Sequence, residues 1–128
     1  MRSRRWVWGP LGVVLAIHDE QLSEHGGIRG VRDLAVVESA LARPHNLVAY
    51  SKSDAAALAA AYAFGLCNNH GFFDGNKRTA WVVAETFLDL NGYTVEAPDA
   101  AVVTAMLSVA SGVLPEADLA HWFRSHIH

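Results

Sequence analysis

Residues 55–66 constrain the fold more than any other part of the chain, because this run is apolar on every side of a helix. It is rich in alanine, and its larger side chains include Leu58 and Tyr62. Ser53 and Asp54 precede it and offer oxygen acceptors for the unpaired N–H groups at a helix start. A helix that is hydrophobic all round belongs in the middle of a bundle, where other helices cover it.

Apolar residues at helical spacing predict further helices along most of the remaining chain. Glycines and prolines between the periodic segments mark the helix ends and keep the connections short. We therefore predict an all-α fold, a compact bundle of about six helices that forms a single domain over residues 1–128, with residues 1–10 as an N-terminal arm. Besides the central helix, helices are expected at residues 11–25, 34–41, 79–91, 98–111 and from 115 onward.

The segment before the central helix is not expected to be helical. Arg43 precedes Pro44, and a residue before proline is disfavoured in the helical region, so the second helix should end there. Residues 44–53 carry turn and strand formers such as Asn46 and Val48, without a helical period. We interpret them as a short flap before the central helix.

Composition limits the class of protein. Of the 128 residues 52% are hydrophobic and 18% are charged, which favours a globular domain that buries a core without metal or disulfide staples. The net charge of −3 argues against a broad basic surface for nucleic acid. The apolar run near the N-terminus, residues 6–17, is too short to span a bilayer, so no membrane partner is expected. A single cysteine, Cys67, suits a reducing cytoplasm, where we expect the protein to act.

Residues 70–79 concentrate the polar groups that can carry out chemistry, and they lead into the helix expected at residues 79–91. A loop that enters a helix N-terminus presents unpaired backbone N–H groups, which favour an anion. His70 is the candidate general base, because a histidine can accept a proton at neutral pH and return it. Asp74 is the candidate metal ligand, because Mg²⁺ prefers carboxylate oxygens combined with the phosphates of a substrate.

The second half of this loop favours a phosphate group. Gly75 lets the backbone approach a ligand closely, and Asn76, with the N–H groups that follow it, can hold phosphate oxygens. Lys77 and Arg78 lie in a first helical turn, where cations are unfavourable unless an anion offsets them. Both can stabilise the charge on a transferring phosphoryl group. The candidate catalytic residues are therefore His70, Asp74, Lys77 and Arg78, and the candidate nucleotide contacts are Gly75, Asn76, Lys77 and Arg78.

Several nearby residues are given structural roles. His18 lies beside the apolar stripe of the first helix and is interpreted as a hydrogen-bonded core histidine. Glu38 is expected to pair with an arginine such as Arg32, with a place in the active site as the alternative. Phe72 is expected to anchor the polar loop in the core. Cys67 is expected to behave as a small buried hydrophobe.

The order of the residues in the loop is more specific than any of them alone. The string His70-x-Phe72-x-Asp74-Gly75-Asn76-Lys77-Arg78 resembles the signature of the Fic/Doc, or Fido, superfamily. Its Asn-Lys-Arg ending is similar to the Doc, or death-on-curing, branch. The resemblance covers most of the chain, because residues 15–19, 25–27, 38–44 and 87–93 also look like Doc-family stretches in the same order.

This resemblance implies an α-helical Fido fold and the toxin of a bacterial type II toxin–antitoxin system. Doc-type members are protein kinases that use Mg-ATP to phosphorylate a threonine of elongation factor Tu, and so halt translation. By carry-over, His70 would deprotonate the target hydroxyl, Asp74 would hold Mg²⁺, and Asn76, Lys77 and Arg78 would grip the nucleotide phosphates. The implied partners are elongation factor Tu and a Phd-like antitoxin, whose C-terminal segment would fold into an apolar groove near the site. The flap at residues 44–53 would dock the target, by strand addition.

Three positions bear on the type of reaction. Fic relatives, which transfer AMP, have a glycine where this chain has Lys77, and in the Doc branch a lysine there accompanies a reversed nucleotide that presents its γ-phosphate. The Fic signature also ends in a second arginine, at the position that Trp81 occupies here, which makes AMP transfer less expected. Asn68 replaces an arginine of the Doc pattern, so the contact of that arginine is not expected.

Alternatives to a kinase remain open. The chain could be a Fic-type AMP transferase, or a catalytically silent Fido binding module, although a silent copy has no chemical reason to keep the four polar motif residues. A Cys67–His70 nucleophilic pair is less expected than a metal hydrolase. A metal hydrolase would need three protein ligands in tetrahedral geometry, and the tail that holds the last histidines should be frayed. Its ligands would be His70, Asp74 and one of His45, His121, His126 and His128.

Overall fold

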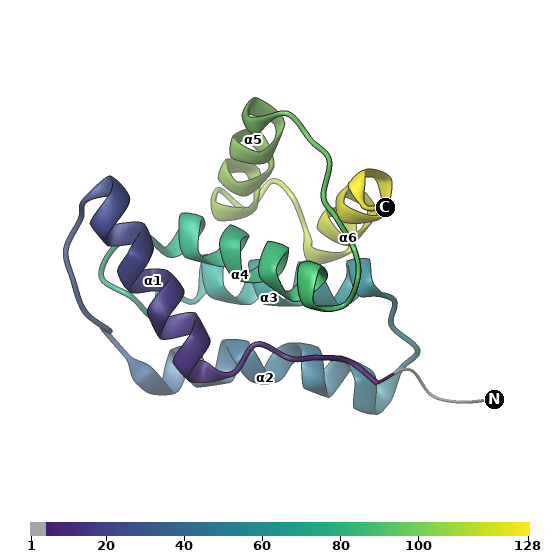
Figure 1. Ribbon diagram of the computed structural model, residues 1–128, viewed down its shortest axis with the longest axis horizontal. Coiled ribbons are helices and arrows are strands. Elements are labelled where there is room, and N and C mark those ends of the chain that lie inside the picture. Colours follow the sequence, from purple (N-terminus) through teal and green to yellow (C-terminus); the bar gives the residue numbers. More distant parts are fainter. Residues whose placement is uncertain (1–4) are drawn as a thin grey trace.

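A computed structural model describes residues 5–128, which form six helices joined by short connections (Figure 1). The all-α bundle predicted from the sequence is therefore confirmed. Residues 1–4 of the expected arm lie outside the described part of the chain. The helices are α1 (Leu11–His25), α2 (Leu34–Tyr50), α3 (Ala55–Asn68), α4 (Asn76–Leu90), α5 (Asp99–Ala110) and α6 (Glu116–His126).

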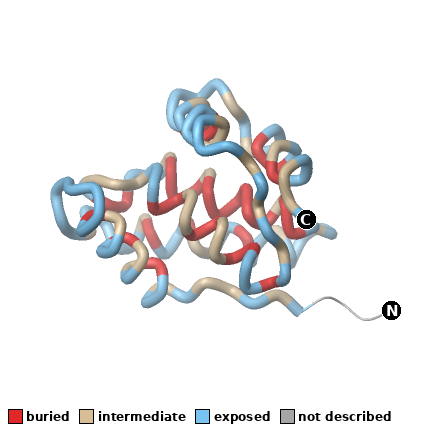
Figure 2. Tube along the Cα trace, turned by 45° about the horizontal axis from the view of Figure 1, so that its top comes forward, coloured by how far each residue is buried: buried red, intermediate tan, exposed pale blue. Residues whose placement is uncertain are grey.

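Helix α3 lies at the centre of the bundle, as its apolar sequence predicted. It packs against α2, α4, α5 and α6, and its buried side chains include Leu58, Tyr62 and Leu66. Figure 2 shows the buried residues along the middle of the molecule and the exposed ones on the outer connections. The Asp54 carboxylate caps the first turn by accepting a hydrogen bond from the Ala57 N–H at 2.9 Å. The helices packed around α3 therefore hold its C-terminal end, from which the chain continues to His70.

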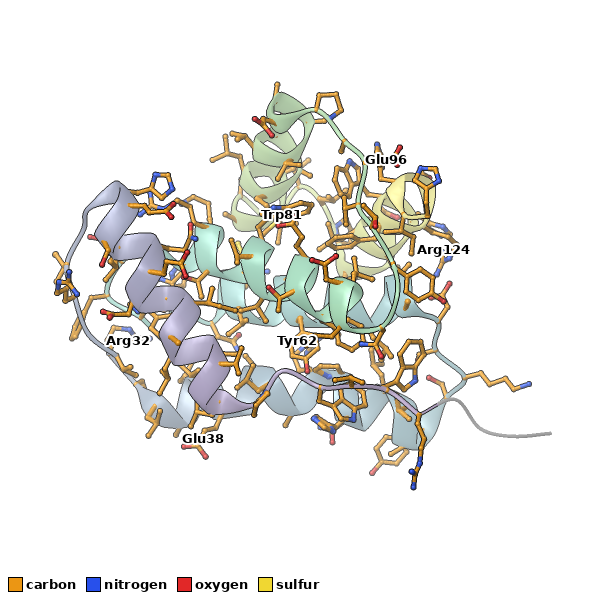
Figure 3. The ribbon with its side chains drawn as sticks, viewed as in Figure 1. Arg32, Glu38, Tyr62, Trp81, Glu96 and Arg124 are labelled. Atoms are coloured by element: carbon orange, nitrogen blue, oxygen red, sulfur yellow. The ribbon has the colours of Figure 1, made fainter. Side chains whose placement is uncertain are left out.

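The Asp54 carboxylate also joins α3 to α6. Arg124 donates two hydrogen bonds to it, from Nε at 2.7 Å and from Nη2 at 3.0 Å. These bonds hold the pKa of Asp54 below its ordinary value. One carboxylate thus both starts the central helix and fixes the last one (Figure 3 labels Arg124).

The prediction that the second helix ends at Arg43 is wrong, and so are the bounds of the flap. Helix α2 continues through Pro44 to Tyr50, so only residues 51–54 remain as the connection before α3. A proline inside a helix removes one backbone hydrogen bond and costs about 3 kcal/mol, and here tertiary packing offsets that cost. Pro44 is buried, Arg43 pairs with Glu116 of α6, and His45 stacks against Trp8 with ring centroids 4.0 Å apart.

The described part of the N-terminal arm lies along the bundle in extended form. The Asn91 amide accepts a hydrogen bond from the Val7 N–H and donates one to the Val7 carbonyl, both at 2.9 Å. Trp8 packs against Tyr62 and Phe87, and the Gly9 N–H donates to the Tyr62 hydroxyl at 3.2 Å. The arm therefore covers the junction of α3 and α4.

The expectation of a frayed C-terminal tail is also wrong. Residues 126–128 pair with residues 94–96, with an antiparallel bridge between Val95 and Ile127. The Thr94 and His128 backbones exchange hydrogen bonds at 3.0 and 2.9 Å. Backbone pairing with a distant segment orders this end, and sequence position alone could not reveal it.

None of the helices in residues 5–128 has the length and apolar character needed to cross a bilayer.

Candidate functional site

The residues singled out by the sequence lie where two connections run side by side. We call residues 70–75, between α3 and α4, the motif loop. The α1–α2 connection passes along it. Figure 1 shows both connections at the end of the molecule where α1 ends and α4 begins. An antiparallel bridge joins Val31 to Phe72, and the Phe73 N–H donates to the Gly30 carbonyl at 3.4 Å. The motif loop is therefore held by backbone contacts from one side.

His70 is exposed and has a left-handed backbone conformation, with φ 51°. It is the only non-glycine residue among residues 5–128 with positive φ. Such a conformation costs on the order of 1–3 kcal/mol and persists only where the surroundings impose it. Here the Arg32 side chain donates from Nε to the His70 carbonyl at 2.6 Å. An exposed imidazole on a backbone held in this way is suited to meet a ligand from solvent.

Gly71 fits so closely against α2 that a side chain could not be accommodated. A Cβ atom at this position would lie 2.5 Å from Val37 Cγ2, well inside van der Waals contact. The Gly71 carbonyl accepts hydrogen bonds from the N–H groups of Arg32 and Asp33, at 2.8 and 3.1 Å. The first turn of α2 thus fixes the backbone directly after the candidate base.

Asp74 is fixed at both its backbone and its side chain. Its Oδ2 accepts a hydrogen bond from the Ile28 N–H at 2.9 Å, and its carbonyl oxygen lies 2.9 Å from His18 Nε2, which donates to it. His18 is buried and its ring stacks on Phe72 with centroids 3.7 Å apart and planes at 12°. The interpretations of His18 as a hydrogen-bonded core residue and of Phe72 as the apolar anchor are both confirmed. The sequence did not reveal that His18 binds the motif loop, through the Asp74 carbonyl and the Phe72 ring.

The motif loop ends at the N-terminus of α4. Gly75 is the N-cap, in a left-handed conformation with φ 75° and ψ 17°, and no side chain in residues 5–128 caps this helix. The first turn holds no acidic residue, and Lys77 and Arg78 are both exposed there. Arg78 donates from Nη2 to the Gly26 carbonyl at 3.2 Å. Open N–H groups, the positive end of the helix dipole and two cations together fit a phosphate group.

The Asn76 side chain braces the loop. Its Oδ1 accepts from the Phe72 N–H at 3.1 Å, and its Nδ2 donates to the Phe72 carbonyl at 3.0 Å. Both polar atoms of the Asn76 side chain therefore bind the backbone of Phe72 and join the start of α4 to the motif loop.

The ion pair expected for Glu38 is absent from the described residues, whereas Cys67 is placed as expected. Glu38 is exposed and takes part in no ion pair within residues 5–128, so the expected Arg32–Glu38 pair is wrong. Figure 3 shows Arg32 near the two connections and Glu38 directed away from the body of the protein. Cys67 is buried as expected, and burial raises the pKa of its thiol, which disfavours the reactive thiolate.

The described residues contain no group of three or more His, Cys, Asp or Glu side chains placed to hold a metal ion. The three-ligand metal hydrolase therefore has no support from the geometry. A Mg²⁺ ion held by Asp74 and by the phosphates of a substrate does not need such a group.

A groove opens beside the cationic turn, between α1, α4 and α5. Its volume is about 250 Å³, and its lining is mostly apolar. Lys77 and Arg78 border it, so it is continuous with the candidate phosphate site. Its other lining residues are Gln21, His25, Trp81, Val82, Val102, Val103, Met106 and Leu107.

Comparison with known proteins agrees with the geometry. The sequence model of the Fic/DOC family matches residues 8–88. A protein named protein kinase doc, from Escherichia phage P1, is 33% identical over 113 residues, which cover 87% of this chain and 88% of that protein. A protein named toxin Doc, from Mycolicibacterium smegmatis, is 44% identical over 75 residues, which cover 56% of this chain and 57% of that protein. This chain thus spans less than two thirds of the second relative.

Proposed function

Because the chain belongs to the Fic/DOC family and to its Doc branch, we propose that it is the toxin of a bacterial toxin–antitoxin pair. It acts as a Mg-ATP-dependent protein kinase on a threonine hydroxyl of a translation factor such as elongation factor Tu. One arrangement supports this most. An exposed histidine lies just before a helix N-terminus that has two exposed cations and no side-chain cap.

In this proposal His70 is the general base. It accepts the proton of the target hydroxyl as the oxygen forms a bond to the γ-phosphorus of ATP and the bond to the bridging oxygen of ADP breaks. Its exposure lets a protein side chain reach it from solvent, and the fixed backbone limits the positions that the imidazole can take.

The start of α4 holds the phosphates. The N–H groups after Gly75 bind phosphate oxygens, and the side chains of Lys77 and Arg78 stabilise the charge that spreads over the transferring group. Asp74 is the ligand for Mg²⁺, which neutralises phosphate charge when it is bound. The Ile28 N–H binds Oδ2 of this carboxylate, so Oδ1 is the oxygen that would be available to hold the ion.

Two features favour phosphate transfer over AMP transfer. Lys77 stands at the position where the resembled Fic signature has a glycine. Trp81, at the place of the second Fic arginine, packs in the protein: its ring is parallel to Phe123 within 6°, with centroids 5.8 Å apart, and meets Trp122 edge-on. A packed indole cannot supply the positive charge that an arginine would give to a phosphate.

The reaction can be tested by incubating the protein with elongation factor Tu, Mg²⁺ and ATP that carries the label at either the γ- or the α-phosphate. The proposal expects label on the factor from γ-labelled ATP alone. Transfer of the α-label would identify an AMP transferase. No transfer of either label to any protein of a bacterial lysate, together with no binding of Mg-ATP by calorimetry, would favour the silent binding module.

The groove between α1, α4 and α5 is the proposed docking site of the antitoxin segment. Its apolar floor suits one face of an amphipathic helix, and the cationic border formed by Lys77 and Arg78 suits acidic residues in that segment. Because the groove borders the phosphate site, a segment bound there would also interfere with the nucleotide.

A matched pair of valines tests this docking site. Val103 lines the groove and is 57% exposed, whereas Val113 is 75% exposed and lies outside the lining. Val103→Asp should weaken binding of the antitoxin peptide by roughly 10- to 100-fold, because it places a charge in an apolar contact. Val113→Asp should leave binding unchanged. Calorimetry with the peptide, and growth of cells that carry both genes, measure the effect. Equal neutralisation of the two variants would contradict the docking site.

A further inference from the structure

We propose that Arg32 is a positioning residue that keeps the base in its working orientation by holding the backbone of His70. The inference rests on the proposed function, because it assigns to His70 the role of general base. It follows from four hydrogen bonds that Arg32 and Asp33, just before α2, donate to residues 69–71, and from the packing of Val37 in the first turn of α2 against Gly71.

The first contacts come from the guanidinium group. Arg32 donates from Nε to the His70 carbonyl at 2.6 Å and from Nη2 to the Asn69 carbonyl at 3.5 Å. Asn69 is the C-cap of α3 and His70 follows it, so both carbonyls lie next to the helix end at which backbone carbonyls lack helical partners and the dipole is negative. A cation with several fixed donors is the side chain best suited to satisfy two of them together.

The next contacts come from the backbone. The N–H groups of Arg32 and Asp33 both donate to the Gly71 carbonyl. Asp33 also caps α2, since its Oδ1 accepts from the Val36 N–H at 3.3 Å. Val37, one turn further along, packs against Gly71. The peptide groups before and after the His70 Cα are thus both bound to the residues that begin α2.

These contacts explain the unfavourable backbone of His70. A histidine at φ 51° relaxes to negative φ unless its neighbours prevent this. Such a rotation about the backbone would swing the imidazole to a different direction, because Cβ moves with it. Arg32 has no carboxylate partner within residues 5–128, so its hydrogen bonds to these carbonyls are its described polar contacts. Glu38, the partner expected from the sequence, does not compete for it.

The test compares Arg32→Ala with Arg29→Ala. Arg29 lies in the same connection, but its Nη1 binds the exposed Asp19 carboxylate at 2.8 Å, and within residues 5–128 its side chain forms no hydrogen bond or ion pair with the motif loop. Two measurements are made on each variant. The ¹³Cα and ¹³Cβ chemical shifts of His70 report whether its backbone stays left-handed, and steady-state phosphorylation gives kcat and the KM for ATP.

We expect Arg32→Ala to lose the left-handed shift pattern at His70 and to lower kcat by about 10²-fold, since a misplacement of about 1 Å at a reacting group can cost that much. The KM for ATP should stay within about twofold, because the start of α4 is untouched. Arg29→Ala should match the wild type in both measurements.

Arg32→Gln, whose shorter side chain lacks the charge and the Nε–H donor of the guanidinium, repeats the test if the alanine variant does not fold. A left-handed His70 in the variant, or an unchanged kcat, would overturn the inference. A wild-type protein that transfers no phosphate would overturn the proposed function instead, and the chemical shifts would still show whether Arg32 sets the backbone of His70.

Discussion

Replacing His70 with alanine is expected to remove toxicity and to lower the rate of phosphate transfer by roughly 10²- to 10⁴-fold, the range for loss of a general base. The fold should survive, because the side chain is exposed and contributes nothing to the core. His70→Asn provides a second variant, since asparagine adopts positive φ more readily than most non-glycine residues and so removes the base without adding the backbone strain of alanine. Loss of activity in both variants would assign the effect to the imidazole.

The measurement is transfer from γ-labelled ATP at saturating nucleotide, together with growth after induction and thermal unfolding by circular dichroism. His121→Ala is the control, because His121 is an exposed histidine of α6, remote in sequence from the motif loop. Full toxicity of the His70 variants would remove His70 from the reaction. A collapse of the unfolding temperature would mean that the residue is structural.

Asp74→Asn is expected to abolish the dependence of the reaction on Mg²⁺ and to lower kcat/KM by roughly 10²- to 10³-fold, because a preorganised charge at the reacting phosphates is lost. The substitution is close to isosteric. An asparagine oxygen can still accept the hydrogen bond of the Ile28 N–H, and the backbone contact with His18 does not involve the side chain. The motif loop should therefore keep its shape, which separates loss of the ion from loss of the loop.

Calorimetry of ATP binding with and without Mg²⁺ gives the direct readout. In the wild type the ion should tighten binding, and in Asp74→Asn this difference should vanish. Asp19→Asn serves as the matched control, since Asp19 is an exposed carboxylate of α1 that pairs with Arg29. If Mg²⁺ tightened ATP binding equally in the wild type and in Asp74→Asn, the metal would have to be held elsewhere.

Much of the fold could be predicted because local pattern decided it. Helix α1 begins and ends at the predicted residues, and α3 is central because a helix that is apolar all round can only be buried. Pro44 shows where local rules fail. Its preference against helix is real, but contacts with α6 and the N-terminal arm on either side of it favour the helix by more. Such contacts join residues distant in sequence and leave no periodic signal.

The same division holds for the candidate site. The loop sequence predicted that the candidate residues lead into a helix N-terminus, and α4 begins within them at Asn76. It did not predict what holds the loop. The hydrogen bonds of Arg32 to the His70 carbonyl and of His18 to the Asp74 carbonyl connect segments 38 and 56 residues apart. A charge-based rule paired Arg32 with Glu38, and it overlooked the backbone carbonyls of Asn69 and His70, which follow the last residue of α3.

The central helix has a consequence for genetics. Because α3 is both the core of the bundle and the element that leads directly into His70, its packing determines stability and the placement of the base together. Survivors selected after expression without the antitoxin should therefore carry lesions in two classes, in the loop itself and along the alanine-rich face of α3. Those of the second class would be heat-sensitive alleles, in which toxicity returns when the cells are cooled.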